Sequence, residues 1–187
     1  MRRIRSALLA LLLLLCAAGF AYADEAAAWA ALRAGGHVAL MRHTDAPGGT
    51  GDPPGFRLGD CASQRNLSAK GRADAHKIGA RLKAEGIVFE RVLASPWCRC
   101  MDTAAIMKMG MVEAEPAFSN VVVLSDQKEK LTAAGRAIID GWQEKGLLLV
   151  VTHGANIFAL TGISPASGEI VVIKSGSHEA VGRLRLE

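Results

Sequence analysis

The sequence predicts an α/β domain built on a largely parallel central sheet. Short apolar runs such as 38–41 (VALM) and 147–152 (LLLVVT) are typical of strands that are buried on both faces. Longer segments of helical composition separate these runs. Strands that alternate with helices along a chain indicate a layered domain in which helical crossovers join parallel strands.

The amino-terminal elements are a helix, a strand and a long loop. Residues 24–33 favour a helix with acids in its first turn, and Gly35 and Gly36 end it. The strand at 38–41 follows. Residues 44–65 are rich in Gly, Pro and Asp and predict no regular element. Because loops of this length inside compact domains are usually functional or disordered, we interpret 44–65 as a loop on the substrate side, with a flexible surface insertion as the alternative.

The middle of the chain repeats the helix–strand pattern. Ser68 is a good N-cap for a helix over 68–85. A short strand is expected at 91–94. Ser95 can cap the next helix, which places Pro96 in a first turn that tolerates proline. This helix is expected to reach about residue 109.

The remaining elements follow from β-branched and apolar runs separated by glycine. They are a short strand within 118–124, a helix at 132–145, a strand at 147–152, a helix to about residue 160, and final strands at 170–173 and 180–186.

The first 23 residues have the layout of a secretory signal peptide. They combine a basic start, an apolar run and an A-x-A cleavage site: Arg2, Arg3 and Arg5, then residues 7–18, then residues 21–23. We therefore expect a domain over residues 24–187 that is periplasmic or secreted, with no stable membrane anchor after cleavage. The alternatives are a retained anchor, for which the apolar run is short, and lipidation at Cys16, which small residues do not precede.

Charge and cysteine content limit the possible partners. The net charge of +4 depends on the three leader arginines, and without them 19 basic residues face 18 acidic ones. A nucleic-acid partner is therefore not expected.

Cys61, Cys98 and Cys100 remain after the leader, and an oxidising compartment favours one disulfide. Cys61 is expected to pair with Cys98 or with Cys100. The oligomeric state stays open.

Polar side chains recur where a predicted strand gives way to the next segment. Arg42 and His43 follow the strand at 38–41, Arg99 lies just after the strand at 91–94, and His153 follows the strand at 147–152. Parallel strands place these ends at one edge of the sheet, so the four side chains are expected to converge. Such a pocket is cationic and fits an anion, and the planar donors of arginine match phosphate oxygens. A histidine between arginines stays neutral and can act as a nucleophile toward phosphorus.

Four segments resemble motifs of the histidine phosphatase (phosphoglycerate mutase-like) superfamily, and they occur in the family's order. They are 40–44 (LMRHT), 65–73 (RNLSAKGRA), 95–104 (SPWCRCMDTA) and 150–154 (VVTHG). The resemblance implies a three-layer α/β/α sandwich with no metal and no cofactor. It also implies that His43 is the phosphorylated nucleophile and that Arg42, Arg99 and His153 bind the transferring phosphoryl group.

The resemblance extends to weaker assignments. Thr44 replaces the glycine of the Arg-His-Gly motif, and with Asn66 and Asn156 it is expected on the substrate side. The acid that one branch of the family places directly after the second histidine is absent. Candidates for a general acid in the other branch's position are Glu115, Asp126 and Glu129, of which Asp126 is preferred because it follows the run at 121–124.

The expected function is a metal-independent phosphomonoesterase that works through a phosphohistidine. The leader and the Cys-containing segments make the chain similar to the periplasmic group that includes lipopolysaccharide core heptose phosphate phosphatase, so the substrate is expected to be a small or envelope-linked phosphomonoester such as a sugar phosphate. The alternatives are a phosphohistidine-directed protein phosphatase and a non-catalytic phosphate- or glycan-binding module. A metal hydrolase is disfavoured because the histidines show no paired ligand spacing: His37, His43, His76, His153 and His178.

Overall fold

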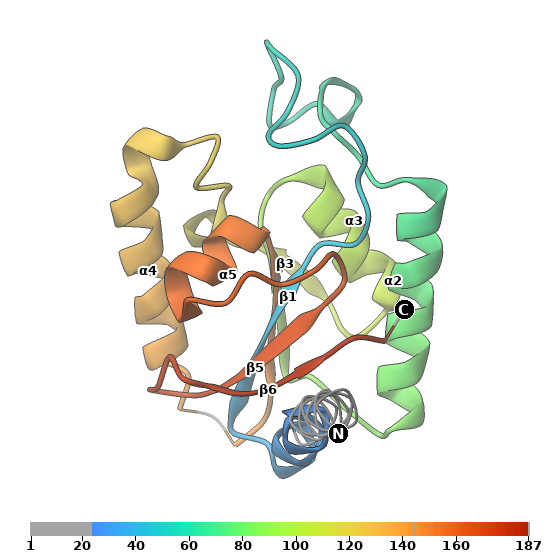
Figure 1. The fold of residues 1–187 in the computed structure, drawn as a ribbon, viewed down its shortest axis with the longest axis vertical. Coiled ribbons are helices and arrows are strands. Elements are labelled where there is room, and N and C mark those ends of the chain that lie inside the picture. Colours follow the sequence, from blue (N-terminus) through green and yellow to red (C-terminus); the bar gives the residue numbers. More distant parts are fainter. Residues whose placement is uncertain (1–23, 144, 187) are drawn as a thin grey trace, which may run out of the picture.

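The computed structural model describes residues 24–143 and 145–186. The predicted signal peptide at 1–23 therefore lies outside the described residues. The described part is a sheet covered by helices on both faces (Figure 1). The prediction of a three-layer α/β/α sandwich is confirmed.

The sheet has six strands in the order β3-β2-β4-β1-β5-β6. Its strands are β1 (His37–Arg42), β2 (Arg91–Ala94), β3 (Val112–Ala114), β4 (Leu148–Thr152), β5 (Ile170–Lys174) and β6 (Ala180–Leu184). β1 pairs in parallel with β4, β4 with β2 and β2 with β3, whereas β5 is antiparallel to both of its neighbours. The largely parallel sheet predicted from the apolar runs is therefore present.

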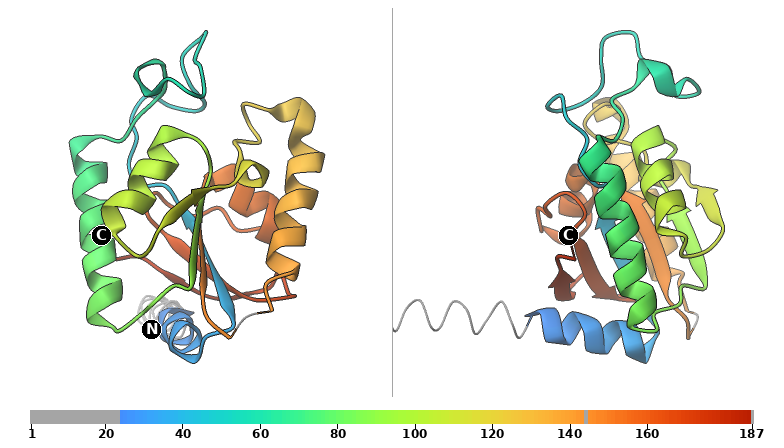
Figure 2. Two further views of the ribbon diagram at one scale, coloured as in Figure 1. Left: turned by 180° about the vertical axis from the view of Figure 1, so that it is seen from behind. Right: turned by 90° about the vertical axis from the view of Figure 1, so that its right-hand side faces the viewer.

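Helices from different parts of the chain cover the two faces. The helical residues 24–34 lie with α2 (Ala69–Ala84) and α3 (Cys98–Met107) on one face, and α4 (Lys128–Asp140) lies with α5 (Gly154–Thr161) on the other (Figure 2). Side chains of β1 alternate between the two cores. Ala39 and Met41 belong to the first core, and Val38 and Leu40 belong to the second. Among residues 24–143 and 145–186, no helix has the length and apolar character needed to cross a membrane.

The strand predicted within 118–124 is wrong. Residues Pro116–Phe118 form a short 3-10 helix, and 121–124 form a turn. Asn120 Oδ1 accepts from Val122 N (2.9 Å) and Val123 N (3.3 Å), so a side chain satisfies backbone donors that a strand would pair in a ladder. The sequence also missed β3, a strand of three residues with a polar residue at its centre.

The start of α3 differs from its prediction. The helix begins at Cys98, with Trp97 at the N-cap position and no side-chain cap. Ser95 does not cap it, because its hydroxyl lies 2.9 Å from His153 Nε2. In contrast, Ser68 caps α2 as predicted by accepting from Gly71 N (2.9 Å).

Candidate active site

The ends of β1 and β4 bring the two histidines together. These strands are neighbours, and Arg42 is paired with Thr152 in their register. His43 N donates to Thr152 O (2.9 Å), which extends the ladder by one residue. The His43 and His153 rings then lie edge to face, with centroids 5.5 Å apart and planes at 73°. The convergence expected from parallel strand ends is therefore observed for Arg42, His43 and His153.

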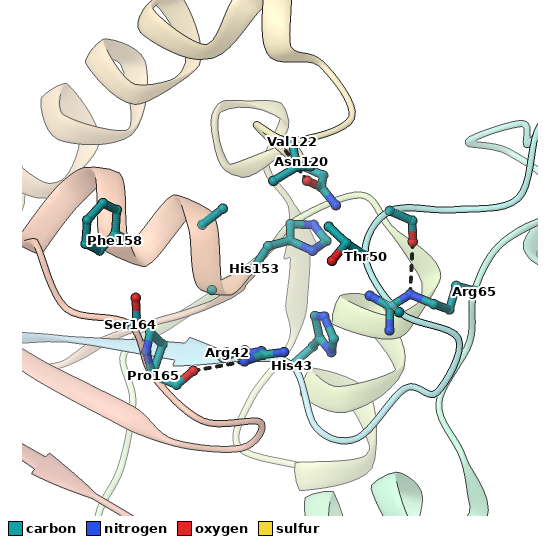
Figure 3. A pocket seen from close by; sticks show the side chains of 14 residues that line it. Arg42, His43, Thr50, Arg65, Asn120, Val122, His153, Phe158, Ser164 and Pro165 are labelled. Atoms are coloured by element: carbon teal, nitrogen blue, oxygen red, sulfur yellow. Dashed lines mark hydrogen bonds between the residues drawn. The ribbon is translucent and has the colours of Figure 1, made fainter.

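A cavity of about 400 Å³ opens at this edge of the sheet. Its lining combines basic, polar and apolar residues from both strand ends, the 44–65 loop, the turn at 120–122, α5 and the segment after it (Figure 3). The lining residues are Arg42, His43, Gly49, Thr50, Gly51, Arg65, Asn120, Val122, His153, Gly154, Ala155, Phe158, Ser164 and Pro165.

His43 is a buried, neutral imidazole with a defined tautomer. Its Nδ1 lies 2.8 Å from Thr44 O, and because a carbonyl only accepts, Nδ1 carries the proton. Burial is the main reason that the pKa of His43 is lowered to about 3. The positive charges of Arg99, Arg65 and Arg42 lower it further, whereas the hydrogen bond to Thr44 acts to raise it. Nε2 therefore keeps a lone pair at neutral pH, which nucleophilic attack on phosphorus requires.

His153 is buried beside the first histidine and is held from three sides. Its Nε2 lies 2.9 Å from Ser95 Oγ, its Nδ1 lies 3.5 Å from Arg99 Nη2, and the Trp97 ring meets it edge to face at 5.6 Å. Burial lowers the pKa of His153 well below its usual value, and the proximity of His43 and Arg99 lowers it further. His153 is thus a neutral, fixed donor or acceptor at the cavity wall.

Arg42 is oriented by the segment that enters β5. Its Nη1 donates to Pro165 O (3.0 Å). The next residue, Ala166, donates its N–H to Glu169 Oε2 (2.7 Å), and Glu169 is buried in ion pairs with Arg183 and Arg185. The carbonyl that holds Arg42 is therefore anchored to a buried carboxylate.

Gly154 lets Arg42 lie against the first turn of α5. A Cβ at Gly154 would come within 3.3 Å of Arg42 Cδ and 3.5 Å of Arg42 Nε. The missing side chain leaves that space to the arginine, and the amino-terminal N–H groups of α5 lie at the same wall of the cavity. A guanidinium and a helix start on one side of the cavity together favour an anion.

Arg65 is a cavity residue that the sequence reasoning did not assign. Its Nε donates to Gly51 O (2.9 Å) and its Nη1 to Ala46 O, so the side chain ties together the loop that it ends. Figure 3 shows its guanidinium directed toward the cavity. Burial and the nearby charge of Arg99 lower the pKa of Arg65 from its usual value. Its position directly before Asn66, in the motif at 65–73, was an available signal.

Arg99 does not line the cavity. It forms a buried ion pair with Asp52, with Nη1–Oδ1 at 2.7 Å and Nη2–Oδ2 at 3.3 Å, and neither side chain is exposed. Asp52 also accepts from Trp97 Nε1 (2.9 Å) and Arg65 N (3.0 Å). Burial acts to raise the pKa of Asp52, but the hydrogen bonds from Arg99 and Arg65 N hold it below its usual value. The Arg99 guanidinium, which was predicted to contact phosphate directly, therefore binds the Asp52 carboxylate instead. Arg65 supplies the second arginine of the cavity.

The cysteine alternatives are resolved in favour of Cys61–Cys98. Their Cα atoms are 5.7 Å apart, and the bridge joins the 44–65 loop to the first residue of α3. Gln64 Oε1 accepts from Cys98 N (3.0 Å) at the same junction. Cys100 is a buried thiol 3.7 Å from His153 Nε2, and burial raises the pKa of that thiol to about 12.

Thr44, Asn66 and Asn156, which were predicted on the substrate side, are not among the residues that line the cavity. Thr44 Oγ1 is buried 3.2 Å from Thr103 Oγ1, so it joins β1 to α3. Asn66 donates to Cys61 O (2.6 Å) within its own loop. Asn156 donates to Ser119 O (2.8 Å) and accepts from Val121 N (3.3 Å), which fixes the turn beside the cavity.

The structure does not bring Asp126, the preferred candidate for a general acid, to the cavity. Asp126 is exposed on a 3-10 helix (Ser125–Gln127) and does not line the cavity, because the strand expected to end beside it is a turn. Glu115 caps another 3-10 helix by accepting from Ala117 N (3.0 Å), and Glu129 is exposed at the start of α4. No Asp or Glu side chain is among the described residues that line the cavity.

Thr50 and Asn120 are two further polar cavity residues that the sequence did not indicate. Asn120 uses its Oδ1 for the turn, and Figure 3 shows its side-chain nitrogen on the cavity side near His153. Thr50 approaches from the opposite wall with its hydroxyl. Both residues lie in irregular segments, where no periodicity marks an inward side chain. In the described part of the chain, no group of three or more His, Cys, Asp or Glu side chains is arranged to hold a metal ion.

Comparison with known proteins agrees with the resemblance found in the sequence. The model of the histidine phosphatase superfamily (branch 1) matches residues 39–121, which include most of β1, the 44–65 loop, α2 and α3. Over this range, which is less than half of the chain, the sequence is similar to the histidine phosphatase superfamily. His43 and the 44–65 loop lie within the matched residues, and β4 brings His153 to them from outside that range.

Solved structures share the fold at low identity. The alpha-ribazole phosphatase from Shigella flexneri aligns with 16% identity and a TM-score of 0.58, over 81% of this chain and 96% of its own. The protein histidine phosphatase SixA, complexed with tungstate, aligns with 22% identity and a TM-score of 0.52, over 77% and 92%. Bacillus stearothermophilus YhfR aligns with 16% identity and a TM-score of 0.55, over 77% and 93%. No curated protein matches the sequence significantly.

Proposed function

We propose that this histidine phosphatase-fold protein is a phosphomonoesterase that transfers the phosphoryl group to His43. The observation that carries the proposal is the state of His43. Its Nδ1–H is committed to Thr44 O at 2.8 Å, burial keeps the ring neutral, and the ring lines a cavity that two arginines also line. Attack by Nε2 forms a P–N bond as the ester P–O bond breaks, and the departing oxygen takes a proton from solvent water. Water then attacks the phosphorus, the P–N bond breaks, and inorganic phosphate leaves as the ring returns to its neutral form.

The surrounding groups stabilise charge without taking part in covalent steps. Arg42 and Arg65 provide the planar donors that bind the three peripheral phosphoryl oxygens. His153 packs against the nucleophile, 5.5 Å between ring centroids, and completes the phosphoryl pocket. Arg99 acts indirectly, by positioning His153, because its guanidinium binds Asp52 and lies beside Nδ1 of His153. The reaction in this form uses no metal ion.

The experiment is hydrolysis of p-nitrophenyl phosphate by the purified protein, with and without a chelator, for wild type, His43→Ala and His76→Ala. His76 is exposed on α2 and serves as the matched control. We expect chelator-resistant turnover that His43→Ala abolishes and His76→Ala leaves unchanged. Chelator-sensitive turnover that survives His43→Ala contradicts the mechanism. Tight phosphate binding without turnover identifies a binding module instead.

The second candidate is a phosphatase directed at phosphohistidine or at other phosphoryl groups with easily departing leaving groups. The observation that favours it is the lack of an Asp or Glu among the described cavity residues, which leaves the departing group without a carboxylic proton donor. Comparing kcat/KM for phosphoramidate and for glycerol phosphate separates the candidates. A large preference for phosphoramidate supports the second candidate, and comparable values support a general phosphomonoesterase.

We further propose that the protein works outside the cytoplasm on a sugar phosphate of the cell envelope. The leader pattern of residues 1–23 and the Cys61–Cys98 disulfide both support an oxidising compartment. Amino-terminal sequencing of the exported protein is expected to begin at Asp24. Retention of the leader, or a protein confined to the cytoplasm, would contradict the localisation.

A further inference from the structure

The lining of the active-site cavity is positively charged at one end and apolar at the other. Arg65 and Arg42 supply positive charge beside the neutral His43, where the phosphoryl group is expected. Phe158 on α5 and Val122 in the turn supply apolar surface to the same cavity. In Figure 3, Arg65 and Phe158 lie on opposite sides of His153. A phosphomonoester held by its phosphoryl group at His43 would therefore direct its leaving group along an increasingly apolar wall.

The two apolar residues are unusually exposed for their type. Phe158 is 55% exposed and Val122 is 45% exposed. Six large hydrophobic side chains are exposed among the described residues, and these two are the ones that line the cavity. Phe158 is the aromatic member of that set, and single exposed apolar residues elsewhere need no explanation. Apolar surface beside convergent polar groups is the usual composition of a ligand site.

A second hollow continues from the first on the far side of Phe158. It has a volume of about 390 Å³, and Phe158 is the residue that its lining shares with the active-site cavity. Polar side chains of α4 line it, namely Lys128, Glu129, Thr132 and Arg136. Arg136 Nη2 donates to Ala159 O (2.8 Å), which holds α4 against α5 at this position. The surface beyond the ring is of mixed charge and suits hydroxyl groups better than a second anion.

We propose that Phe158 and Val122 form a leaving-group subsite that binds the face of a ring. The inference rests on the proposed phosphatase function and narrows its substrate class to phosphomonoesters with a cyclic leaving group. A pyranose ring or an aromatic ring presents the same apolar C–H or π face to Phe158. A pyranose in addition places hydroxyl groups toward the polar hollow beside α4. Phe158 is thus a specificity residue that contacts the leaving group and takes no part in the covalent steps.

Binding of non-hydrolysable phosphonates tests the subsite independently of turnover. Wild type is expected to bind phenylphosphonate about fivefold to tenfold more tightly than methylphosphonate, measured by calorimetry. Phe158→Ala should remove that preference and leave methylphosphonate affinity unchanged, and Phe158→Tyr should keep the preference. Met111→Ala is the matched control, because Met111 is 82% exposed and does not line the cavity. Equal affinities for the two phosphonates in wild type would overturn the subsite.

Turnover then identifies which ring the subsite serves. In Phe158→Ala, kcat/KM should fall about fivefold to tenfold, through KM, for phenyl phosphate and for a hexopyranose 6-phosphate, with glycerol phosphate unchanged. A loss confined to phenyl phosphate would overturn the sugar assignment. An equal loss for all three esters would show a structural role and overturn the subsite. Absence of turnover in wild type, with the phosphonate preference intact, would overturn the proposed function while supporting the subsite.

Discussion

The strand ends and the 44–65 loop both supply side chains to the cavity, but different interactions hold them in place. Arg42, His43 and His153 follow from the register of β1 and β4, which are buried on both faces. Thr50 and Arg65 come from a loop without regular structure over most of its length. Its position depends on side chains, namely the Asp52–Arg99 ion pair, the Arg65 hydrogen bonds and the Cys61–Cys98 bridge.

The two histidines and the 44–65 loop are therefore held in place by different kinds of interaction. His43 and His153 are held in place by backbone hydrogen bonds of β1 and β4 that no single surface substitution removes. The second arginine is fixed by a few specific contacts, one of which is to the side chain of Asp52. The loop is therefore the part of the site where changes are expected to alter substrate binding before they alter the histidines.

The largest effect is expected from Asp52→Asn. The substitution leaves Arg99 as a buried charge without its carboxylate, and breaking a buried pair in this way costs about 3–5 kcal/mol of unfolding free energy. The loop also loses its main anchor, so KM for phosphate esters should rise. Denaturant unfolding and steady-state kinetics measure the two effects.

Asp102→Asn is the matched control for this prediction. Asp102 pairs with Arg72 at 3.0 Å on the surface, and removing an exposed pair should change stability by less than about 1 kcal/mol. Similar losses in the two variants would show that the Asp52–Arg99 pair does not anchor the loop.

A smaller effect is expected from removing the disulfide by Cys61→Ser with Cys98→Ser. The bridge spans 37 residues of sequence, and its loss should lower the unfolding free energy by about 2–4 kcal/mol. Because β1 and β4 do not depend on it, kcat should change less than KM. A reductant added to wild type should reproduce the effect and should leave the serine variant unchanged. A kcat that falls as far as kcat/KM would instead place the bridge in the support of the histidines.

The smallest effect concerns the pH dependence of stability at the strand ends. The pKa of His43 is about 3 in the folded protein and about 6.5 when exposed, so the unfolded chain binds the additional proton between these values. Its contribution to stability is present above pH 6.5 and is lost as the pH falls toward 3. Between pH 7 and pH 5 the loss should be about 2 kcal/mol. The difference between wild type and His43→Gln measures it, and parallel stability curves would contradict a buried neutral His43.

The two regions also mark how far the sequence could predict the site. Arg42, His43 and His153 were predictable because apolar runs identify buried strands, and the ends of neighbouring parallel strands meet. The Asp52–Arg99 pair was not predictable, because a loop carries no period that says which of its carboxylates turns inward. For the same reason the sequence did not indicate that Arg99 would pair with a carboxylate or that Arg65 would line the cavity.

The turn at 120–124 shows a second limit. Its valine run predicts a strand, and the predicted acid at Asp126 depended on that strand. The amides of Asn120 and Asn156 satisfy the backbone there, and this tertiary arrangement overrides the β propensity of valine. The error in one element therefore carried over into the candidate general acid.

Capture of the covalent intermediate tests the central claim most directly. Wild-type protein is mixed with an aryl phosphate, quenched in base, in which a phosphohistidine survives, and digested for mass spectrometry. The account predicts one phosphoryl group on His43, none in His43→Ala, and an unchanged label in His76→Ala. Turnover with the label on another residue, or a label that persists in His43→Ala, would contradict it.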